Sequence, residues 1–293
     1  MTDRYAVIGN PVAHSRSPSI HAQFAEQTGQ DLVYERLHAP VDAFDVTVDA
    51  FRAAGGRGLN VTLPFKVAAH DYANARSARA RAAGAANTLR FEGADVDADN
   101  TDGVGLVRDL SGRLGFALAG ARVLLAGAGG AARGVILPLL EAGVASLVVA
   151  NRTLGKAAAL AALAADARVS ACGFDLVRDA QGRAGGFARD EGAGGARETG
   201  FDLIVNATSA GLSGAAPALA ESAYAGVRLA YDMVYAAEPT VFMRHALALG
   251  CPRVSDGLGM LVEQAAESFR VWRGVSPQTE PVYRRLRAEI SGH

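Results

Sequence analysis

The sequence has little lysine, little cysteine and no long apolar run. Lys66 and Lys156 are the only lysines among 29 basic residues. Cys172 and Cys251 lie far apart, so they form no closely spaced pair of the kind that holds a metal ion. No apolar run approaches the roughly 20 residues that cross a bilayer. These absences argue against a membrane protein and against a metal site, and they favour a reducing, cytoplasmic setting.

The charges are balanced, with a formal net charge of −1. Because no basic excess exists to neutralise phosphates or anionic lipids, we expect neither a nucleic acid nor a membrane as partner. Residues 4–8 form a strand-like segment, without the basic and apolar regions of a signal peptide. A small-molecule substrate is the expected partner, and a monomer and a homodimer both stay open.

The scarcity of lysine makes the two lysine positions informative. Arginine keeps its proton near neutral pH, whereas a lysine amine can release its proton in a suitable environment. A position that must exchange a proton therefore cannot be filled by arginine. Lys66 and Lys156 are accordingly candidates for a chemical role.

Short apolar segments alternate with helical patterns along the 293 residues, which predicts an α/β fold with mostly parallel strands in two domains. Strands are expected at residues 5–8, 33–37, 58–61, 87–91, 94–98, 123–126, 147–150, 203–206 and 229–232. Helices are expected at residues 18–28, 41–53, 101–114, 130–142, 154–165, 259–273 and 281–290. Residues 178–200 are glycine-rich and charged, which predicts a mobile surface loop or a weak helix rather than a part of the core.

A glycine-rich loop follows the predicted strand 123–126 and opens the next helix. Its sequence, Gly127-Ala-Gly129-Gly-Ala-Ala132, has the spacing and the context of a dinucleotide-binding fingerprint. The first glycine allows a tight turn, the second admits a pyrophosphate, and a small third residue lets the helix pack on the strand. The N–H groups at the helix start then bind phosphate. The loop predicts a Rossmann-type nucleotide domain.

The end of the second strand of this unit indicates which nucleotide binds. An NAD-specific site places an acid there for the ribose 2′-hydroxyl. Here the segment is Asn151-Arg-Thr153, and Arg152 offers a guanidinium for a 2′-phosphate, with Lys156 one turn later. Both cations could instead be solvated at a helix start, although a positive charge is slightly unfavourable in that place. The pattern favours NADP as the cofactor.

Three further segments are dense in polar residues. The first is Gly9-Asn-Pro-Val-Ala-His-Ser15-Arg-Ser17-Pro18, in which Ser17 is a natural N-cap before Pro18. The second is Asn60-Val-Thr62-Leu-Pro-Phe-Lys66, which follows a predicted strand where open α/β sheets bind ligands. The third combines Asn87-Thr88 with Asp99-Asn-Thr-Asp102-Gly103. Capping alone explains single members of these segments but not the whole set.

Together these motifs resemble the shikimate dehydrogenase family along nearly the whole chain. The matching segments, in family order, are Gly9-Asn-Pro, His14-Ser-Arg-Ser-Pro18, Asn60-Val-Thr-Leu-Pro-Phe-Lys66, Gly84-Ala-Ala-Asn-Thr88, Asp99-Asn-Thr-Asp-Gly103, the glycine-rich loop, Asn151-Arg-Thr153, Asn206-Ala-Thr-Ser209, Tyr231-Asp-Met-Val-Tyr235 and Asp256-Gly-Leu-Gly-Met260 with Gln264. The chain departs from many relatives at Ala78, where they carry an acid, and in the longer loop 178–200.

The resemblance implies NADPH-dependent reduction of 3-dehydroshikimate to shikimate, a step of aromatic amino-acid biosynthesis. It implies that Lys66 donates and accepts the proton, paired with Asp102. The implied substrate-binding residues are Ser15, Ser17, Asn60, Thr62, Lys66, Asn87, Asp102, Tyr235 and Gln264. The predicted cofactor-binding residues are Gly127, Ala128, Gly129, Gly130, Ala131, Asn151, Arg152, Thr153, Lys156, Met233 and Gly257.

The expected architecture is a substrate domain formed by residues 1–102 with the C-terminal helices at about 256–293, and a Rossmann NADP-binding domain at 103–255. Two alternatives stay open. A quinate/shikimate dehydrogenase would accept NAD, and a non-catalytic NADP-binding regulator would keep the glycine-rich loop without needing Lys66 and Asp102. A surface position for Lys66 after a turn would also remove its chemical role.

Overall fold

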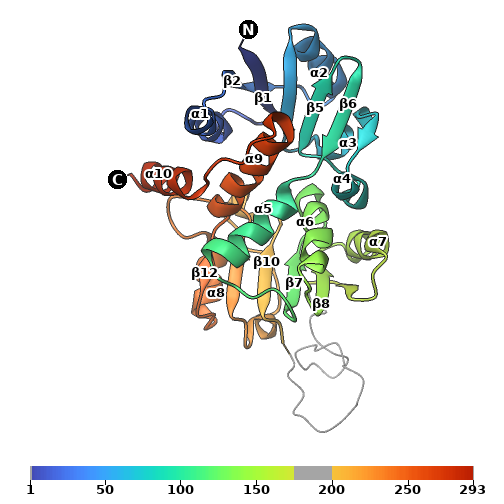
Figure 1. Ribbon diagram of the computed structural model, residues 1–293. Helices are drawn as coiled ribbons and strands as arrows, with labels where there is room; N and C mark the ends of the chain where they lie inside the picture. The colour runs from blue at the N-terminus through green and yellow to red at the C-terminus, as the bar shows by residue number, and fades with distance from the viewer. Residues whose placement is uncertain (1, 175–199, 293) are drawn as a thin grey trace. The chain divides into compact units, whose positions relative to one another are not determined.

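The computed structural model describes residues 2–174 and 200–292 and divides into two compact units. The first comprises Met1–Gly115, Arg133–Pro138 and Gly259–His293, and the second comprises Phe116–Ala132 and Leu139–Leu258. Among the described residues each unit contains one six-stranded sheet. Figure 1 shows strands of both sheets with helices beside them. The two-part α/β architecture expected from the sequence is thereby confirmed.

The first unit contains a mixed sheet with the strand order β2-β1-β3-β5-β6-β4. Its strands are β1 (Asp3–Gly9), β2 (Leu32–His38), β3 (Gly56–Val61), β4 (Ala75–Arg76), β5 (Thr88–Glu92) and β6 (Asp95–Asp99). Strand β1 pairs in parallel with β2 and β3, whereas β5 pairs antiparallel with β3 and β6. The strands expected at 87–91 and 94–98 thus form a hairpin, and Gly93 occupies its turn with φ +60°.

Helices cover both faces of this sheet. The helices of this unit are α1 (Ser17–Thr28), α2 (Phe44–Ala53), α3 (Lys66–Tyr72), α4 (Ala78–Ala83), α5 (Asp102–Arg108) with the π-helical turn Asp109–Arg113, α9 (Leu258–Arg273) and α10 (Glu280–Ser291).

 Helix α2, Phe44–Ala53, begins three residues later than the sequence predicts. Successive residues of a strand point to opposite faces. Ala6 accordingly packs in the core beneath α2, and Tyr5 stacks on Trp272 of α9 with ring centroids 4.7 Å apart.

The second unit contains a parallel sheet with the order β12-β11-β10-β7-β8-β9. Its strands are β7 (Arg122–Ala126), β8 (Ser146–Ala150), β9 (Val169–Cys172), β10 (Leu203–Asn206), β11 (Leu229–Asp232) and β12 (Val254–Ser255). If the six strands of this unit are numbered 1 to 6 along the chain, their order from β9 across to β12 is 3-2-1-4-5-6. This is the order of a doubly wound dinucleotide-binding sheet, which binds its ligand where the winding reverses, between β7 and β10.

Helices and short turns accompany this second sheet. They are α6 (Gly130–Glu141), of which Arg133–Pro138 belong to the first unit, α7 (Leu154–Ala164), α8 (Val241–Ala248) and the 3-10 turns Ala210–Ser213 and Glu221–Tyr224. A core of fully buried side chains that includes Leu124, Ile204 and Phe242 packs on one face of the sheet. The predicted surface loop at 178–200 lies almost entirely outside the described residues.

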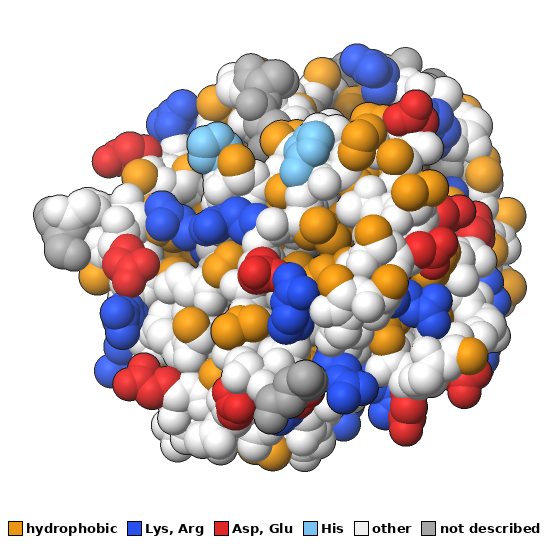
Figure 2. Space-filling model, turned by 90° about the horizontal axis from the view of Figure 1, so that it is seen from above, with side chains coloured by type: hydrophobic (Ala, Val, Ile, Leu, Met, Phe, Trp, Pro, Cys, Tyr) orange, Lys and Arg blue, Asp and Glu red, His pale blue; other side chains and the backbone are white. Residues whose placement is uncertain are grey.

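Three observations bear on possible partners and ligands. Figure 2 shows basic and acidic side chains interspersed with apolar ones on one face of the molecule. Over residues 2–174 and 200–292, no helix is both long enough and apolar enough to cross a membrane. Across the same ranges, no three His, Cys, Asp or Glu side chains come together in a group that could hold a metal ion.

Candidate active site

Lys66 and Asp102 form an ion pair in the first unit. Lys66 is the first residue of α3, five residues after the end of β3, and Asp102 is the first residue of α5, shortly after β6. The Lys66 Nζ lies 2.5 Å from the Asp102 Oδ2, and the two side chains are only 14% and 8% exposed. Partial burial limits screening by water, so the carboxylate holds the amine in a defined place. The fold thus brings together the two residues predicted to carry the chemistry.

Asn87 supports this pair from the start of β5. Its Nδ2 donates to the Asp102 Oδ1 at 2.9 Å, to the Thr101 Oγ1 at 2.9 Å and to the Gln264 Oε1 at 3.2 Å. Its Oδ1 accepts from the Thr101 backbone N–H at 2.8 Å and from the Thr88 hydroxyl at 3.0 Å. Because donors approach the oxygen and acceptors approach the nitrogen, the amide has one favoured orientation. Asn87 therefore joins Asp102 to Gln264.

Gln264 reaches the pair from α9, far along the chain. Its Nε2 donates to the Leu261 carbonyl at 2.8 Å, which leaves the Oε1 directed at Asn87. Gly105 of α5 allows this approach, since a Cβ at that position would lie 2.7 Å from both the Cβ and the backbone nitrogen of Gln264. The missing side chain at Gly105 is therefore required for α9 to lie against α5.

Asn60 and Thr62 lie at the carboxyl end of β3. The Asn60 Nδ2 donates to the Asn87 carbonyl at 3.2 Å and to the Ser268 Oγ at 2.9 Å, and its Oδ1 accepts from the Tyr34 hydroxyl at 2.7 Å. Asn60 thus holds the Asn87 backbone in place through a hydrogen bond to its carbonyl. Thr62 lies against Gly9, where a Cβ would come within 2.4 Å of the Thr62 Cγ2, so the ends of β1 and β3 are in close contact.

Ser15 and Ser17 lie together at the start of α1. Their hydroxyl oxygens are 3.2 Å apart, and the Ser17 backbone N–H donates to the Ser15 Oγ at 3.3 Å. The prediction that Ser17 is the N-cap is wrong, because the helix already includes Ser17 and Arg16 occupies the capping position. The Ser17 hydroxyl accepts a hydrogen bond from the Ser15 hydroxyl. Two adjacent hydroxyls therefore lie at the start of the helix.

The sequence interpretation missed several buried groups that hold these residues in place. Thr101 and Ser268 are fully buried, and their hydroxyl oxygens lie 3.1 Å apart behind Asn87. Burial raises the pKa of the Tyr34 hydroxyl, which donates to Asn60 in its neutral form. Ser268 could have been found from its spacing, because it follows Gln264 by four residues and so shares its helix face. Tyr34 carries no such signal.

The glycine-rich loop has the predicted setting in the second unit. It connects β7 to α6, and β7 pairs in parallel with β8. Gly127 has φ +114°, and a Cβ there would lie 3.0 Å from the carbonyl group of Ala207 in the loop after β10. Gly129 is different, because a Cβ there would meet no heavy atom within 4 Å. Gly127 allows the tight turn, while Gly129 leaves open space beside the backbone, as the predicted pyrophosphate site requires.

The segment after β8 presents two cations. Arg152 and Lys156 are exposed, and neither forms an ion pair with any other residue in the described ranges. Asn151 is tied locally, with its Nδ2 donating to the Thr153 carbonyl at 2.9 Å. Arg152 and Lys156 are therefore available to an anion, and the donor set fits the 2′-phosphate of NADP.

Met233 and Gly257 lie together in the second unit. A Cβ at Gly257 would come within 2.2 Å of the Met233 carbonyl oxygen, so only glycine permits this approach. The Met233 N–H donates to the Asn206 carbonyl at 2.9 Å, and the Gly257 N–H donates to the Val234 carbonyl at 3.2 Å. Tyr235, predicted to bind substrate, follows in the same loop and is half-buried. The ends of β10, β11 and β12 therefore meet around Met233.

A buried acid that was not predicted holds this loop. Asp232, which is fully buried, accepts hydrogen bonds from Asn206 at 3.0 Å, from the Val234 N–H at 3.1 Å and from the Thr240 hydroxyl at 2.7 Å. Burial raises the pKa of this carboxyl, and the hydrogen bonds oppose that shift. Asp232 thereby fixes the backbone on both sides of Met233.

Comparison with known proteins gives matches over the same segments. Family models match at residues 7–89 (shikimate dehydrogenase substrate binding domain), 110–181 (shikimate/quinate 5-dehydrogenase) and 257–287 (shikimate 5′-dehydrogenase C-terminal domain). The shikimate dehydrogenase (NADP+) of Nitrosospira multiformis is 52% identical over 291 residues, which is 99% of each chain.

Solved structures agree with the sequence relatives. An Ael1 enzyme from Pseudomonas putida is 43% identical, with a TM-score of 0.85 over 97% of this chain and 98% of that one. The shikimate 5-dehydrogenase of Thermus thermophilus, solved with NADP(H) and shikimate, is 35% identical, with a TM-score of 0.80 over 97% of this chain and 99% of that one. The family models and the relatives cover both the residues around Lys66 and the glycine-rich loop. The chain therefore belongs to the shikimate dehydrogenase family.

Proposed function

We propose that this protein is an NADP-dependent shikimate dehydrogenase that reversibly reduces 3-dehydroshikimate to shikimate, in the pathway to aromatic amino acids. The observation that carries the proposal is the ion pair of Lys66 and Asp102, in which a largely buried amine lies 2.5 Å from a carboxylate that Asn87 also binds. A regulator that only bound NADP would have no use for this arrangement.

The proposed substrate site takes its anchoring groups from Ser15 and Ser17. Two hydroxyls beside the first turn of a 12-residue helix are suitable donors for the substrate carboxylate. Thr62, Asn87, Asp102, Tyr235 and Gln264 are proposed to contact the ring and its hydroxyls. Asn60 is proposed to contribute by fixing Asn87, because its amide already binds protein groups.

Lys66 is proposed to move the proton. When bound, NADPH supplies the hydride that the carbonyl carbon accepts. Negative charge then develops on the carbonyl oxygen, and the Lys66 ammonium stabilises that charge and donates a proton to it. In the reverse direction the neutral amine takes the proton from the shikimate hydroxyl. Asp102 keeps the amine in place in both directions.

The proposed cofactor site lies in the second unit. The backbone of Gly127, Ala128, Gly129, Gly130 and Ala131 would bind the pyrophosphate, and Arg152 with Lys156 would bind the 2′-phosphate. Asn151 and Thr153 would line the adenosine side. Met233 and Gly257 would line the nicotinamide side. We propose accordingly that the first unit is the substrate domain and the second the NADP domain, and the cytoplasmic setting and a monomer or homodimer stay predictions.

The direct test is formation of NADPH when shikimate is added to purified protein. Four mixtures, shikimate or quinate with NADP or NAD, separate the proposal from its nearest rival. We expect shikimate with NADP to give the highest kcat/KM by at least about tenfold. Preference for quinate with NAD would identify a quinate dehydrogenase instead, and no turnover in any mixture would contradict the proposed function.

A further inference from the structure

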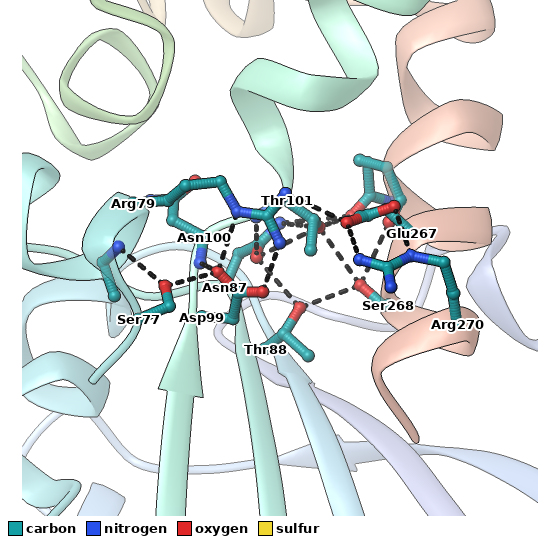
Figure 3. Close-up of polar contacts among 12 residues, drawn as sticks. Ser77, Arg79, Asn87, Thr88, Asp99, Asn100, Thr101, Glu267, Ser268 and Arg270 are labelled. Atoms are coloured by element: carbon teal, nitrogen blue, oxygen red, sulfur yellow. Dashed lines mark hydrogen bonds and ion pairs between the residues drawn. The ribbon is translucent and has the colours of Figure 1, made fainter. Parts of the chain in front are cut away.

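A cluster of buried charges lies next to the Lys66 site and contains none of its residues. At its centre is Arg79, on the short helix α4. Its Nε donates to the Asp99 Oδ1 at 3.0 Å, its Nη2 binds the other oxygen of the same carboxylate, and its Nη1 donates to the Glu267 Oε1 at 2.9 Å. Figure 3 shows Arg79 between the ends of the strands and the helix that carries Glu267. One guanidinium therefore joins three elements, α4, β6 and α9.

Both carboxylates belong to segments that supply site residues. Asp99 is the last residue of β6, three residues before Asp102, and its backbone carbonyl accepts the Asn87 N–H at 3.0 Å. Glu267 lies one turn after Gln264 on α9. Asp102 and Gln264 in turn both accept from the Asn87 Nδ2. Arg79 thus ties together the two segments that meet at Asn87.

The contacts of the two carboxylates are not equivalent. Glu267 also binds Arg108 at 2.9 Å and Arg270 at 2.6 Å, so it has other cations near it. Within residues 2–174 and 200–292, Arg79 is the only cation that forms an ion pair with Asp99. The Asp99 side chain is largely buried and also accepts from the Ser77 hydroxyl at 2.6 Å. Removal of Arg79 therefore leaves a buried carboxylate without its counter-ion, beside Asp102.

We propose that Arg79 is a positioning residue for the dehydrogenase reaction. By binding Asp99 and Glu267 together it fixes Asp102 and Gln264 relative to Asn87, and so it holds the carboxylate that places the Lys66 amine. This inference rests on the proposed function of Lys66 and Asp102. Arg79 itself contacts neither of them, so its effect passes through the backbone from Asp99 to Asp102 and through one turn of α9.

The test compares Arg79→Gln with Arg270→Gln in the full-length protein. Both variants remove one positive charge and one partner of Glu267. Arg270, however, lies on the same helix as Glu267, and within residues 2–174 and 200–292 it forms no ion pair with another element. Steady-state oxidation of shikimate gives kcat and KM, and NADPH fluorescence titration gives the fraction of sites that are folded and able to bind cofactor.

For Arg79→Gln we expect kcat per NADPH-binding site to fall about tenfold or more and KM for shikimate to rise several-fold, because sub-ångström displacement of reacting groups slows a reaction. The Kd for NADPH should stay within about twofold of the unchanged protein. Arg270→Gln should leave kcat and KM within about twofold. If Arg79 only stabilised the fold, Arg79→Gln would reduce the number of active sites. It would not change the KM for shikimate while leaving the Kd for NADPH unaffected.

Two results would overturn the inference: kcat and KM of Arg79→Gln close to those of the unchanged protein, or equal losses in Arg270→Gln. If Arg79→Gln does not fold, Asp99→Asn replaces it in the test. Asparagine keeps the size of the aspartate side chain but weakens its contact with Arg79. We expect the same fall in kcat and rise in KM for shikimate, with an unchanged Kd for NADPH. Lack of turnover by the unchanged protein would overturn the proposed function as well, whereas normal turnover with an unaffected Arg79→Gln would remove this inference alone.

Discussion

At the scale of single residues, we expect the positions after β8 to decide which nucleotide the protein accepts. Asn151, Arg152 and Thr153 stand where an acid would otherwise bind the ribose 2′-hydroxyl, and Arg152 is exposed and without an ion pair in the described part of the chain. A planar guanidinium binds a phosphate through two parallel hydrogen bonds, which a 2′-hydroxyl cannot offer. Selectivity for NADP should therefore depend on Arg152.

Replacement of Arg152 by alanine should raise the KM for NADP by about tenfold or more and leave the KM for NAD nearly unchanged, because only NADP carries the 2′-phosphate. Steady-state kinetics with both cofactors at saturating shikimate measure this. The matched control is Arg228→Ala, which removes another exposed arginine of the second unit at the opposite end of the sheet. Equal changes in KM for the two cofactors would refute the assignment of Arg152.

Reactive side chains are easier to predict from the sequence than the hydrogen-bond partners that position them. The pairing of Lys66 with Asp102 was implied by the family resemblance, and the fold brings the two side chains within 2.5 Å. Tyr34 and Ser268 were not predicted, because their partner Asn60 lies 26 and 208 residues away in the chain. The capping role predicted for Ser17 was wrong, since the same residue types serve caps and ligand sites.

At the scale of elements, the contact between α5 and α9 positions Gln264. A Cβ at Gly105 would lie 2.7 Å from the backbone nitrogen of Gln264 and 2.8 Å from the carbonyl oxygen of Met260. Backbone atoms cannot turn away as a side chain can, so α9 would have to shift. Such overpacking usually destabilises a protein by about 1 to 3 kcal/mol.

Gly105→Ala should therefore lower the free energy of unfolding by about 1 to 3 kcal/mol, although alanine favours helix more than glycine does. It should also raise the KM for shikimate several-fold, because Gln264 moves. Urea unfolding and steady-state kinetics measure the two effects. Gly112→Ala is the control, since a Cβ there meets no heavy atom within 4 Å. A Gly105→Ala protein as stable and as active as the control would contradict this account.

The charge cluster on α9 predicts how stability depends on pH. Burial alone would raise the pKa of Glu267, but hydrogen bonds from Arg270 and Arg79 and the charge of Arg108 lower it to about 2. The ordinary value is 4.5. Because the folded state holds the carboxylate ionised, its contribution is present above about pH 4.5 and is lost as the pH falls towards 2.

Glu267→Gln should accordingly be less stable than the unchanged protein by about 3 kcal/mol at pH 7, and the difference should shrink between pH 4.5 and pH 2. Urea unfolding at several pH values measures it. Arg284 pairs with Glu280 on the exposed face of α10, so Glu280→Gln serves as a surface control with little effect. A stability difference that stays constant over this pH range would contradict the assigned role of Glu267.

The elements missed from the sequence are short or start at a polar motif. Helix α3 begins at Lys66 itself, and α4 has only six residues, four of them alanine. Strand β12 has two residues, too few for a periodic pattern. The long strands and helices with clear alternation or helical spacing were predicted, because burial of one face imposes that spacing on the sequence.

At the scale of the whole molecule, the proposed substrate and cofactor residues are divided between two units, except that Tyr235, proposed to contact the substrate, lies in the second unit with the proposed cofactor residues. Lys66, Asp102, Asn87 and Gln264 lie in the first unit, and the glycine-rich loop with Arg152 lies in the second. The assignment of these motifs to two separate units could be anticipated, because each motif is a short continuous segment that follows a predicted strand. The pairing of α9 with the N-terminal sheet could be inferred only from the family resemblance, since no local pattern joins segments so distant in sequence.

The central claim is that the Lys66 amine exchanges the proton, and variants of this residue test it most directly. The measurement is kcat for shikimate oxidation by Lys66→Ala and Lys66→Arg, together with the Kd for NADPH. Arginine keeps the charge but cannot release its proton. We expect kcat to fall by about 100-fold or more in both variants, with modest changes in KM and an unchanged Kd for NADPH. A Lys66→Arg protein that keeps the kcat of the unchanged enzyme would show that the residue supplies only a positive charge.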